Sequence, residues 1–151
     1  MTENRNDLIE LLKKSVQTVF DSHFGINVSD CHKTPKANGF AAVLPITFKD
    51  EQLIVTLWSE KKLLEKIAFI LLMEETSSDL ELQDVALEML NLIVGHAKVV
   101  ASDQSIGFSM ETPKWIGKHS IDCIMPSCDD VILFQTEENC MALSLKKASG
   151  E

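Results

Sequence analysis

Five positions in the middle of the chain place acidic, amide and basic side chains and a glycine where they could share one face. The segment DVALEMLNLIVGHAKVV spans residues 84–100. On a helix, where successive residues turn by about 100°, these positions fall within an arc of roughly 80°. They are Asp84, Glu88, Asn91, Gly95 and Lys98. A carboxylate can pair with a cation, an amide can donate and accept hydrogen bonds without adding charge, and a glycine leaves room for a partner.

The other positions of this segment are apolar, apart from His96. An ordinary surface helix has a polar face at least as wide as its apolar face, so the pattern predicts a helix sunk in the protein with one narrow slot open. His96 lies in the apolar arc, and we expect a hydrogen-bonded core histidine there rather than a ligand. Alternatively, Glu88 and Asn91 could have a purely structural role and form hydrogen bonds to a neighbouring helix or loop.

The helices and strands that position this slot can be predicted from hydrophobic periodicity and from residues that break helices and strands. Helices are predicted over about residues 5–22, 60–73 and 79–102. Gly25 ends the first helix, Ser59 is expected to cap the second, and Ser78 with Glu81 forms a capping box that opens the third. Strands are predicted over about residues 40–48, 52–58, 105–110, 119–125, 131–136 and 140–145. The first two and the last two strands are joined by short connections and should form antiparallel hairpins.

This order of elements predicts an α+β fold with a mostly antiparallel six-stranded sheet and helices packed on one side. We expect one domain over residues 1–151, with an ordered core of about residues 5–147. A weak internal echo supports a duplicated half-domain, because GINV followed by TPK recurs as GFSM followed by TPK, each time after a helix.

Charge and composition exclude several function classes. The net charge of −9 argues against nucleic acid and anionic membrane surfaces as partners, since both require a basic face. The N-terminal residues lack the apolar core of a signal peptide, and the longest apolar run, 67–73, is far shorter than the ~20 residues that span a bilayer. We therefore expect a cytoplasmic protein.

The cysteines do not have the spacing of a zinc site, so we expect reduced thiols and no metal or cofactor bound by this chain. They are Cys31, Cys123, Cys128 and Cys140. No third residue can be named to orient a Cys–His pair, and the sequence has no phosphate-binding glycine motif. An enzyme acting on a small molecule is therefore disfavoured.

The residues DVALEMLN fit a pattern of Asp or Ser, three residues, Glu, two residues and Asn, with Pro113 further along the chain. In this the sequence resembles the CheC/CheX/FliY chemotaxis phosphatases, which dephosphorylate the response regulator CheY. The likeness extends to SVQTVFDSHFGINV, GFAAVLPITF, QLIVTLWSE and ETPKWIGKHSI, and covers about residues 7–147. Only one signature is present, because Lys13 stands where an asparagine would follow Asn6 and Glu10. The chain is therefore most similar to the single-site, CheX-type members.

The resemblance implies a CheX-like fold, a homodimer joined through its sheets, and hydrolysis of the aspartyl phosphate of a CheY-like response regulator. It implies that Asn91 orients the attacking water and that Glu88 pairs with the lysine beside the phosphoaspartate, while Mg²⁺ is bound by the regulator and not by this chain. Asp84, Gly95 and Lys98 would then contact the regulator, with Asp84 at the rim and Gly95 giving clearance. The alternative is a CheX-like module that only binds a protein of a two-component pathway.

Overall fold

The computed structural model describes residues 2–31, 38–73, 78–104, 107–121 and 130–148. The first helix, α1 (Thr2–Val19), continues into a single π-helical turn, η1 (Phe20–Phe24). Its predicted apolar stripe, which includes Leu8, Leu12 and Val16, is almost completely buried. Gly25 ends the turn with φ 65°, a left-handed conformation that glycine adopts without steric cost.

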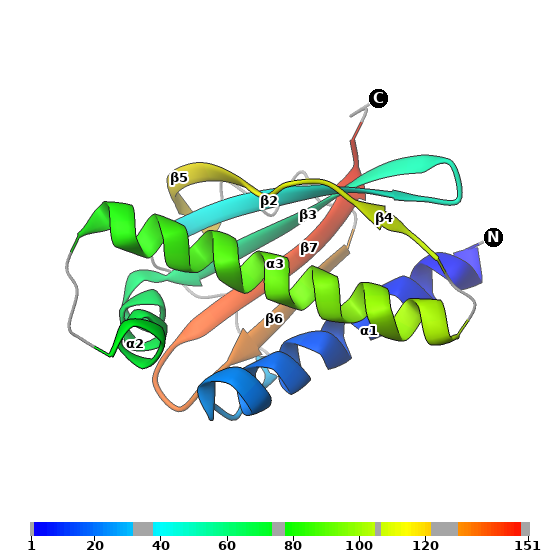
Figure 1. Ribbon diagram of the computed structural model, residues 1–151. Helices are drawn as coiled ribbons and strands as arrows, with labels where there is room; N and C mark the ends of the chain where they lie inside the picture. The colour runs from blue at the N-terminus through cyan, green and yellow to red at the C-terminus, as the bar shows by residue number, and fades with distance from the viewer. Residues whose placement is uncertain (1, 32–37, 74–77, 105–106, 122–129, 149–151) are drawn as a thin grey trace.

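Seven strands form one antiparallel sheet (Figure 1). They are β1 (Ser29–Asp30), β2 (Asn38–Phe48), β3 (Glu51–Glu60), β4 (Ser109–Met110), β5 (Lys114–Ser120), β6 (Asp130–Gln135) and β7 (Cys140–Lys147). The strand order is β1-β6-β7-β3-β2-β4, and β5 also pairs with β2. Since β4 pairs with Ile46–Thr47 and β5 with residues 38–43, the two lie one after the other along the same edge of β2. The sheet therefore has six rows built from seven strands.

The sheet is symmetrical about its centre, because each half contains a short edge strand and the two strands of one hairpin. Hairpin β2–β3 and hairpin β6–β7 meet at the centre, where β3 pairs with β7. The short strands that follow the two long helices, β1 after α1 and β4 after the third helix, lie at opposite edges. Of the two echo segments, GINV leads directly into β1, and GFSM ends with the two residues of β4. The first TPK motif lies outside the described residues.

Helices α2 (Lys61–Leu72) and α3 (Asp79–Asp103) lie with α1 on one face of the sheet, and α1 and α3 run in opposite directions (Figure 1). Their apolar sides and the facing side of the sheet form one continuous core. Length and composition alone would allow α3 to cross a membrane. However, its buried residues, from Leu82 to Ala101, belong to that core, as expected of the central helix of a globular domain.

Three local predictions differ from the structure. Ser59 is a buried residue of β3, and Glu60 occupies the position before α2 without a side-chain cap. The strand predicted over residues 119–125 begins earlier, as β5, and residues 122–129 lie outside the described part of the chain. Within the predicted polar loop, Ser29–Asp30 pairs with β6 as the edge strand β1. The remaining predicted helices and strands are present, with shifts of a few residues at their ends.

Candidate functional site

Helix α3 carries the predicted slot across the sheet. Its start is fixed by Ser78, whose hydroxyl oxygen accepts a hydrogen bond from the main-chain N–H of Glu81 at 3.4 Å, as the capping-box prediction required. Beyond this cap, the face of α3 that packs on the core is apolar at each turn. Burial of that face sets the rotation of the helix and leaves the opposite face toward solvent.

The polar positions all lie on that solvent-facing side. Asp84, Glu88, Asn91 and Lys98 are exposed, and Gly95 is half-buried. Spacings of four, three, four and three residues stack them on successive turns. With a rise of 1.5 Å per residue, the Glu88 and Asn91 backbones are separated by only about 4.5 Å along the helix axis. The structure therefore brings the carboxylate and the amide together on one open surface.

Gly95 leaves free space beside this row. A methyl group added to its α-carbon would find no atom within 4 Å other than those of its chain neighbours and of the adjacent helix backbone. The absence of a side chain therefore serves no packing need within the described residues. It keeps the helix backbone accessible between Asn91 and Lys98.

The open surface of α3 is wider than the predicted narrow slot and is partly apolar. Leu80 is 66% exposed and Val99 is 63% exposed, and Leu87 and Leu92 are half-buried. These side chains border the polar row on both sides, because their helical positions flank its arc. The prediction of a helix buried everywhere except in its slot was wrong, since only the side facing the sheet and its neighbouring helices is covered.

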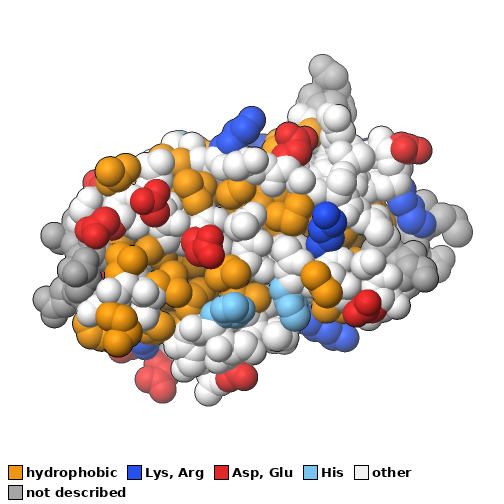
Figure 2. Space-filling model, viewed as in Figure 1, with side chains coloured by type: hydrophobic (Ala, Val, Ile, Leu, Met, Phe, Trp, Pro, Cys, Tyr) orange, Lys and Arg blue, Asp and Glu red, His pale blue; other side chains and the backbone are white. Residues whose placement is uncertain are grey.

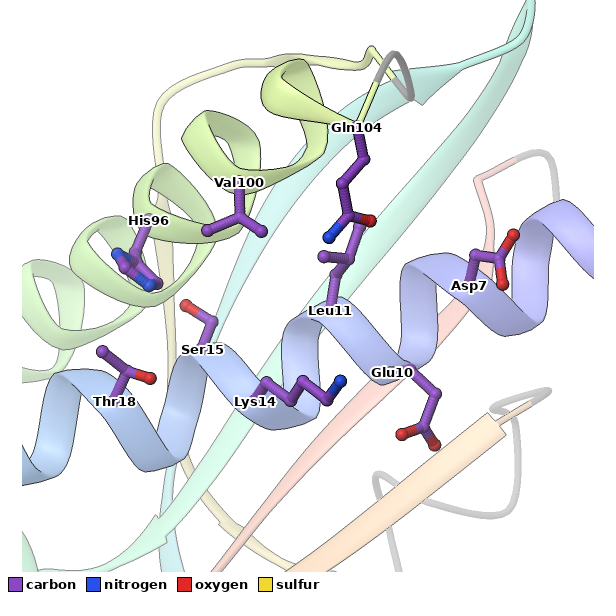
Figure 3. A pocket seen from close by; sticks show the side chains of 9 residues that line it. All are labelled: Asp7, Glu10, Leu11, Lys14, Ser15, Thr18, His96, Val100 and Gln104. Atoms are coloured by element: carbon purple, nitrogen blue, oxygen red, sulfur yellow. The ribbon is translucent and has the colours of Figure 1, made fainter.

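A cavity with a volume of about 530 Å³ lies elsewhere, between α1 and α3 (Figure 3). His96 is half-buried and points into this cavity, so the prediction of a core histidine was wrong. Its position on α3 faces α1, and the two helices leave a gap there that is lined by Lys14, Glu10 and Asp7. Mixed charges and an open position make this cavity a solvated groove.

The side of α1 that corresponds to the α3 slot has no second site of the same kind. Glu10 is exposed, but Lys13 forms an ion pair with Asp30 of β1, with 3.2 Å between Nζ and Oδ2. The lysine therefore ties α1 to the edge of the sheet at the position where the pattern would require asparagine. This supports the interpretation that the chain carries the signature motif once, on α3.

The cysteines that the structure describes, Cys31 and Cys140, are not joined in a disulfide and are partly exposed. Burial, with smaller contributions from the neighbouring Cys31 thiol and the Glu60 carboxylate, raises the pKa of the Cys140 thiol to about 11. A thiol with such a pKa stays protonated near neutral pH and is a poor nucleophile. Among the described residues, no group of three or more potential ligands is arranged to hold a metal ion. Cys123 and Cys128 lie outside the described residues.

Comparison with known proteins agrees with this arrangement. The family model described as chemotaxis phosphatase CheX matches residues 44–136. That range includes the second part of β2 and the whole of β3, α2, α3 and β6. No curated protein matches the sequence.

Several solved structures share the fold at low sequence identity. The chemotaxis protein CheX from Vibrio vulnificus is 15% identical, with a TM-score of 0.76, and the match covers 93% of this chain and 98% of that chain. A chemotactic CheC-like protein from Shewanella oneidensis is 18% identical, with a TM-score of 0.74 and coverage of 97% and 99%. CheX in the CheX–CheY–BeF₃–Mg²⁺ complex from Borrelia burgdorferi is 13% identical, with a TM-score of 0.65 and coverage of 92% and 97%.

Proposed function

The chain belongs to the CheX family, whose model matches more than half of its length, and from this premise we propose that it hydrolyses the aspartyl phosphate of a CheY-like response regulator. Water attacks the phosphorus, the bond to the aspartate oxygen breaks, and inorganic phosphate and a free carboxylate are released. No covalent intermediate on this chain is needed. The protein's task is to hold the water in line and to complement the surrounding charges.

Asn91 is the residue that orients the water in this proposal. Its amide is neutral and carries both a donor and an acceptor, so it can bind a water beside a phosphoryl group without repelling it. A carboxylate at the same position would face the phosphoryl oxygens and be repelled. Support comes from the exposure of Asn91 on α3, where no element of the described structure covers it.

Glu88 lies one turn before Asn91 and is the docking residue. Its exposed carboxylate can pair with a lysine of the regulator beside the phosphoaspartate, which would fix the distance between the two proteins and aim Asn91. Asp84 and Lys98 extend the contact at the two ends of the row, and Gly95 gives the regulator access to the helix backbone. The single observation that carries the proposal is the exposure of Glu88 and Asn91 on consecutive turns of a helix whose other face is buried.

The metal needed for this chemistry belongs to the regulator. Mg²⁺ bound there would neutralise charge on the phosphoryl oxygens, so this chain supplies no metal ligand in the proposed reaction. The Borrelia burgdorferi CheX was crystallised with CheY, BeF₃ and Mg²⁺, a combination that agrees with this division of roles.

A binding module without catalysis is the second candidate, because a family fold can be retained while activity is lost. Phosphate release distinguishes the two functions. Each CheY-like regulator of the same genome is loaded with acetyl phosphate, and phosphate release is followed with and without the protein. We expect acceleration with at least one regulator and none with the Asn91→Ala variant. Unchanged release with all regulators, together with binding of one of them, would establish the module.

We also propose that the protein is cytoplasmic and forms a homodimer, as the resemblance to CheX-type proteins implies. An edge strand exposes unpaired main-chain groups and is commonly protected by a partner. Light scattering at micromolar concentration should give about twice the monomer mass of 16.8 kDa. A particle of monomer mass at that concentration would contradict the dimer.

A further inference from the structure

Large hydrophobic side chains are exposed around the acidic row of α3 and are not used by the proposed chemistry. Phe69 and Met73, at the C-terminal end of α2, are 53% and 84% exposed, and Leu80 and Val99 project from α3 itself. Figure 2 shows hydrophobic surface on both sides of the row of carboxylates. We call Phe69, Met73, Leu80 and Val99 the apolar border of the site. Hydrophobic surface that gathers beside polar residues, unlike single scattered hydrophobic side chains, is typical of an interaction site.

We propose that the apolar border is the docking surface for the receiver domain of the response regulator and supplies most of the binding energy, while Glu88 and Asn91 supply the chemistry. This inference rests on the proposed function and deepens it. A specific interface covers about 800 Å² on each partner, which is much more than a row of five helix positions can offer. A regulator that places its phosphoaspartate over Asn91 must therefore also cover the neighbouring side chains of α3 and α2.

The charges beside the border favour this occupant over a second copy of the chain. Asp79, Asp84 and Glu88 are exposed along the start of α3, whereas Lys98 is the one exposed basic residue within the polar row. In a two-fold interface the same surface would meet itself, and these carboxylates would lack enough cations to pair with. A surface with an apolar centre and basic groups at its rim would fit instead.

Docking on an apolar border would also serve the reaction. Contact of hydrophobic side chains around the row excludes bulk water, and electrostatic interactions strengthen when the local dielectric constant falls. The pair between Glu88 and the cation of the regulator would gain strength, and the one water held by Asn91 would be separated from solvent. Removal of one border side chain leaves the others in place to exclude water, so a single substitution is predicted to change affinity much more than the rate of the chemical step.

The test uses the full chain and the CheY-like regulator that responds in the phosphate-release assay. Phe69→Ser and Leu80→Ser each remove one hydrophobic group of the border, the first on α2 and the second on α3. Val131→Ser is the matched control, because Val131 is 40% exposed on β6 in the sheet and lies outside the border. The dissociation constant is measured for the regulator loaded with beryllium fluoride and Mg²⁺, and phosphate release is measured at saturating and subsaturating concentrations.

We expect each border variant to raise the dissociation constant about tenfold, which is the effect of an interface residue that contributes strongly to binding. The value of kcat at saturating regulator should be unchanged. The control variant should bind the regulator as the wild type does. Thermal melts establish that the variants are folded. Unchanged affinity in folded border variants would overturn the inference while wild-type catalysis upheld the proposed function. A shift of the variants from dimer to monomer would assign the border to a second copy instead. If the wild type neither binds nor dephosphorylates any regulator, both proposals fail.

Discussion

The hydroxyl group of Ser15 on α1 donates a buried hydrogen bond to the main-chain carbonyl oxygen of Ile93 on α3. The bond joins two helices that are far apart in the sequence, and it lies two residues beyond Asn91. It therefore fixes the axial position of α3 against α1 close to the candidate site. Ser15 itself is 1% exposed, so the bond is fully shielded from water.

We expect Ser15→Ala to destabilise the protein by about 1 kcal/mol, because a buried hydrogen bond is lost while the helix still satisfies the Ile93 carbonyl. For a protein of this size, that change corresponds to a fall in Tm of roughly 2–4 °C. Thermal unfolding followed by circular dichroism measures the effect. Ser102→Ala, at an exposed position of α3, is the matched control and should melt close to wild type. Equal Tm values for the two variants would show that the bond contributes no net stability.

Removal of the amide should slow catalysis without weakening docking. Asn91→Ala is expected to lower kcat about 100-fold, as the loss of one positioned polar group does in other enzymes, while the dissociation constant for the regulator changes little. Asn91→Asp keeps the size of the side chain but adds a charge, so it should also weaken binding to the anionic phosphoryl group. Single-turnover phosphate release and binding titrations separate these effects. A large loss of affinity in Asn91→Ala would contradict the assigned role.

Neutralising Glu88 should mainly affect affinity. Glu88→Gln retains the shape of the side chain and removes the charge that pairs with the regulator's cation, so we expect weaker binding together with slower turnover at low regulator concentration. The difference from wild type should shrink as salt is added, because an ion pair near the protein surface is screened. The measurement is the dissociation constant at several ionic strengths. A difference that is independent of salt would exclude a solvent-screened pair.

Gly95→Ala should lower affinity for the regulator without lowering the stability of the protein. Replacing glycine by alanine inside a helix stabilises it by up to about 1 kcal/mol, and the added methyl group meets no atom within 4 Å beyond its chain neighbours and the adjacent helix backbone. We therefore expect an unchanged or higher Tm. Affinity for the regulator should fall if the partner approaches the helix backbone at this point. A variant that is more stable and binds normally would show that Gly95 gives no clearance to the regulator.

Most of the fold follows from periodicity and from turn residues. The stripe of α1, the capping role of Ser78 and the two hairpins are local signals, and each is present in the structure. The cap assigned to Ser59 failed because β3 extends through Ser59 and buries it, so pairing with β7 overrides the local preference. The short strand β1 could not be predicted because two polar residues become a strand only when β6 lies beside them.

The polar row of the candidate site was readable in sequence because its residues share one helix. Helical spacing alone shows that Asp84, Glu88 and Asn91 lie on one side. Which apolar positions of the same helix are exposed depends on where α1, α2 and the sheet end, and no local pattern contains that information. For this reason His96 was assigned to the core, and Val99 was placed in the buried arc although it is exposed. The one signal in the sequence for exposed apolar side chains on α3 was the high share of apolar residues in a helix of 25 residues.

The strand that completes the centre of the sheet is also the last strand to be synthesised. Leu53 pairs with Lys147 and Ser59 with Met141, so the paired residues are about 80 to 95 positions apart in the sequence, and such non-local pairing slows folding. Until β7 emerges from the ribosome, β3 has an open edge and the two halves of the sheet cannot join. Folding of the domain can therefore be completed only after β7 has been synthesised. Deletions that reach β7 would remove the junction between the two halves rather than trim an end of the protein.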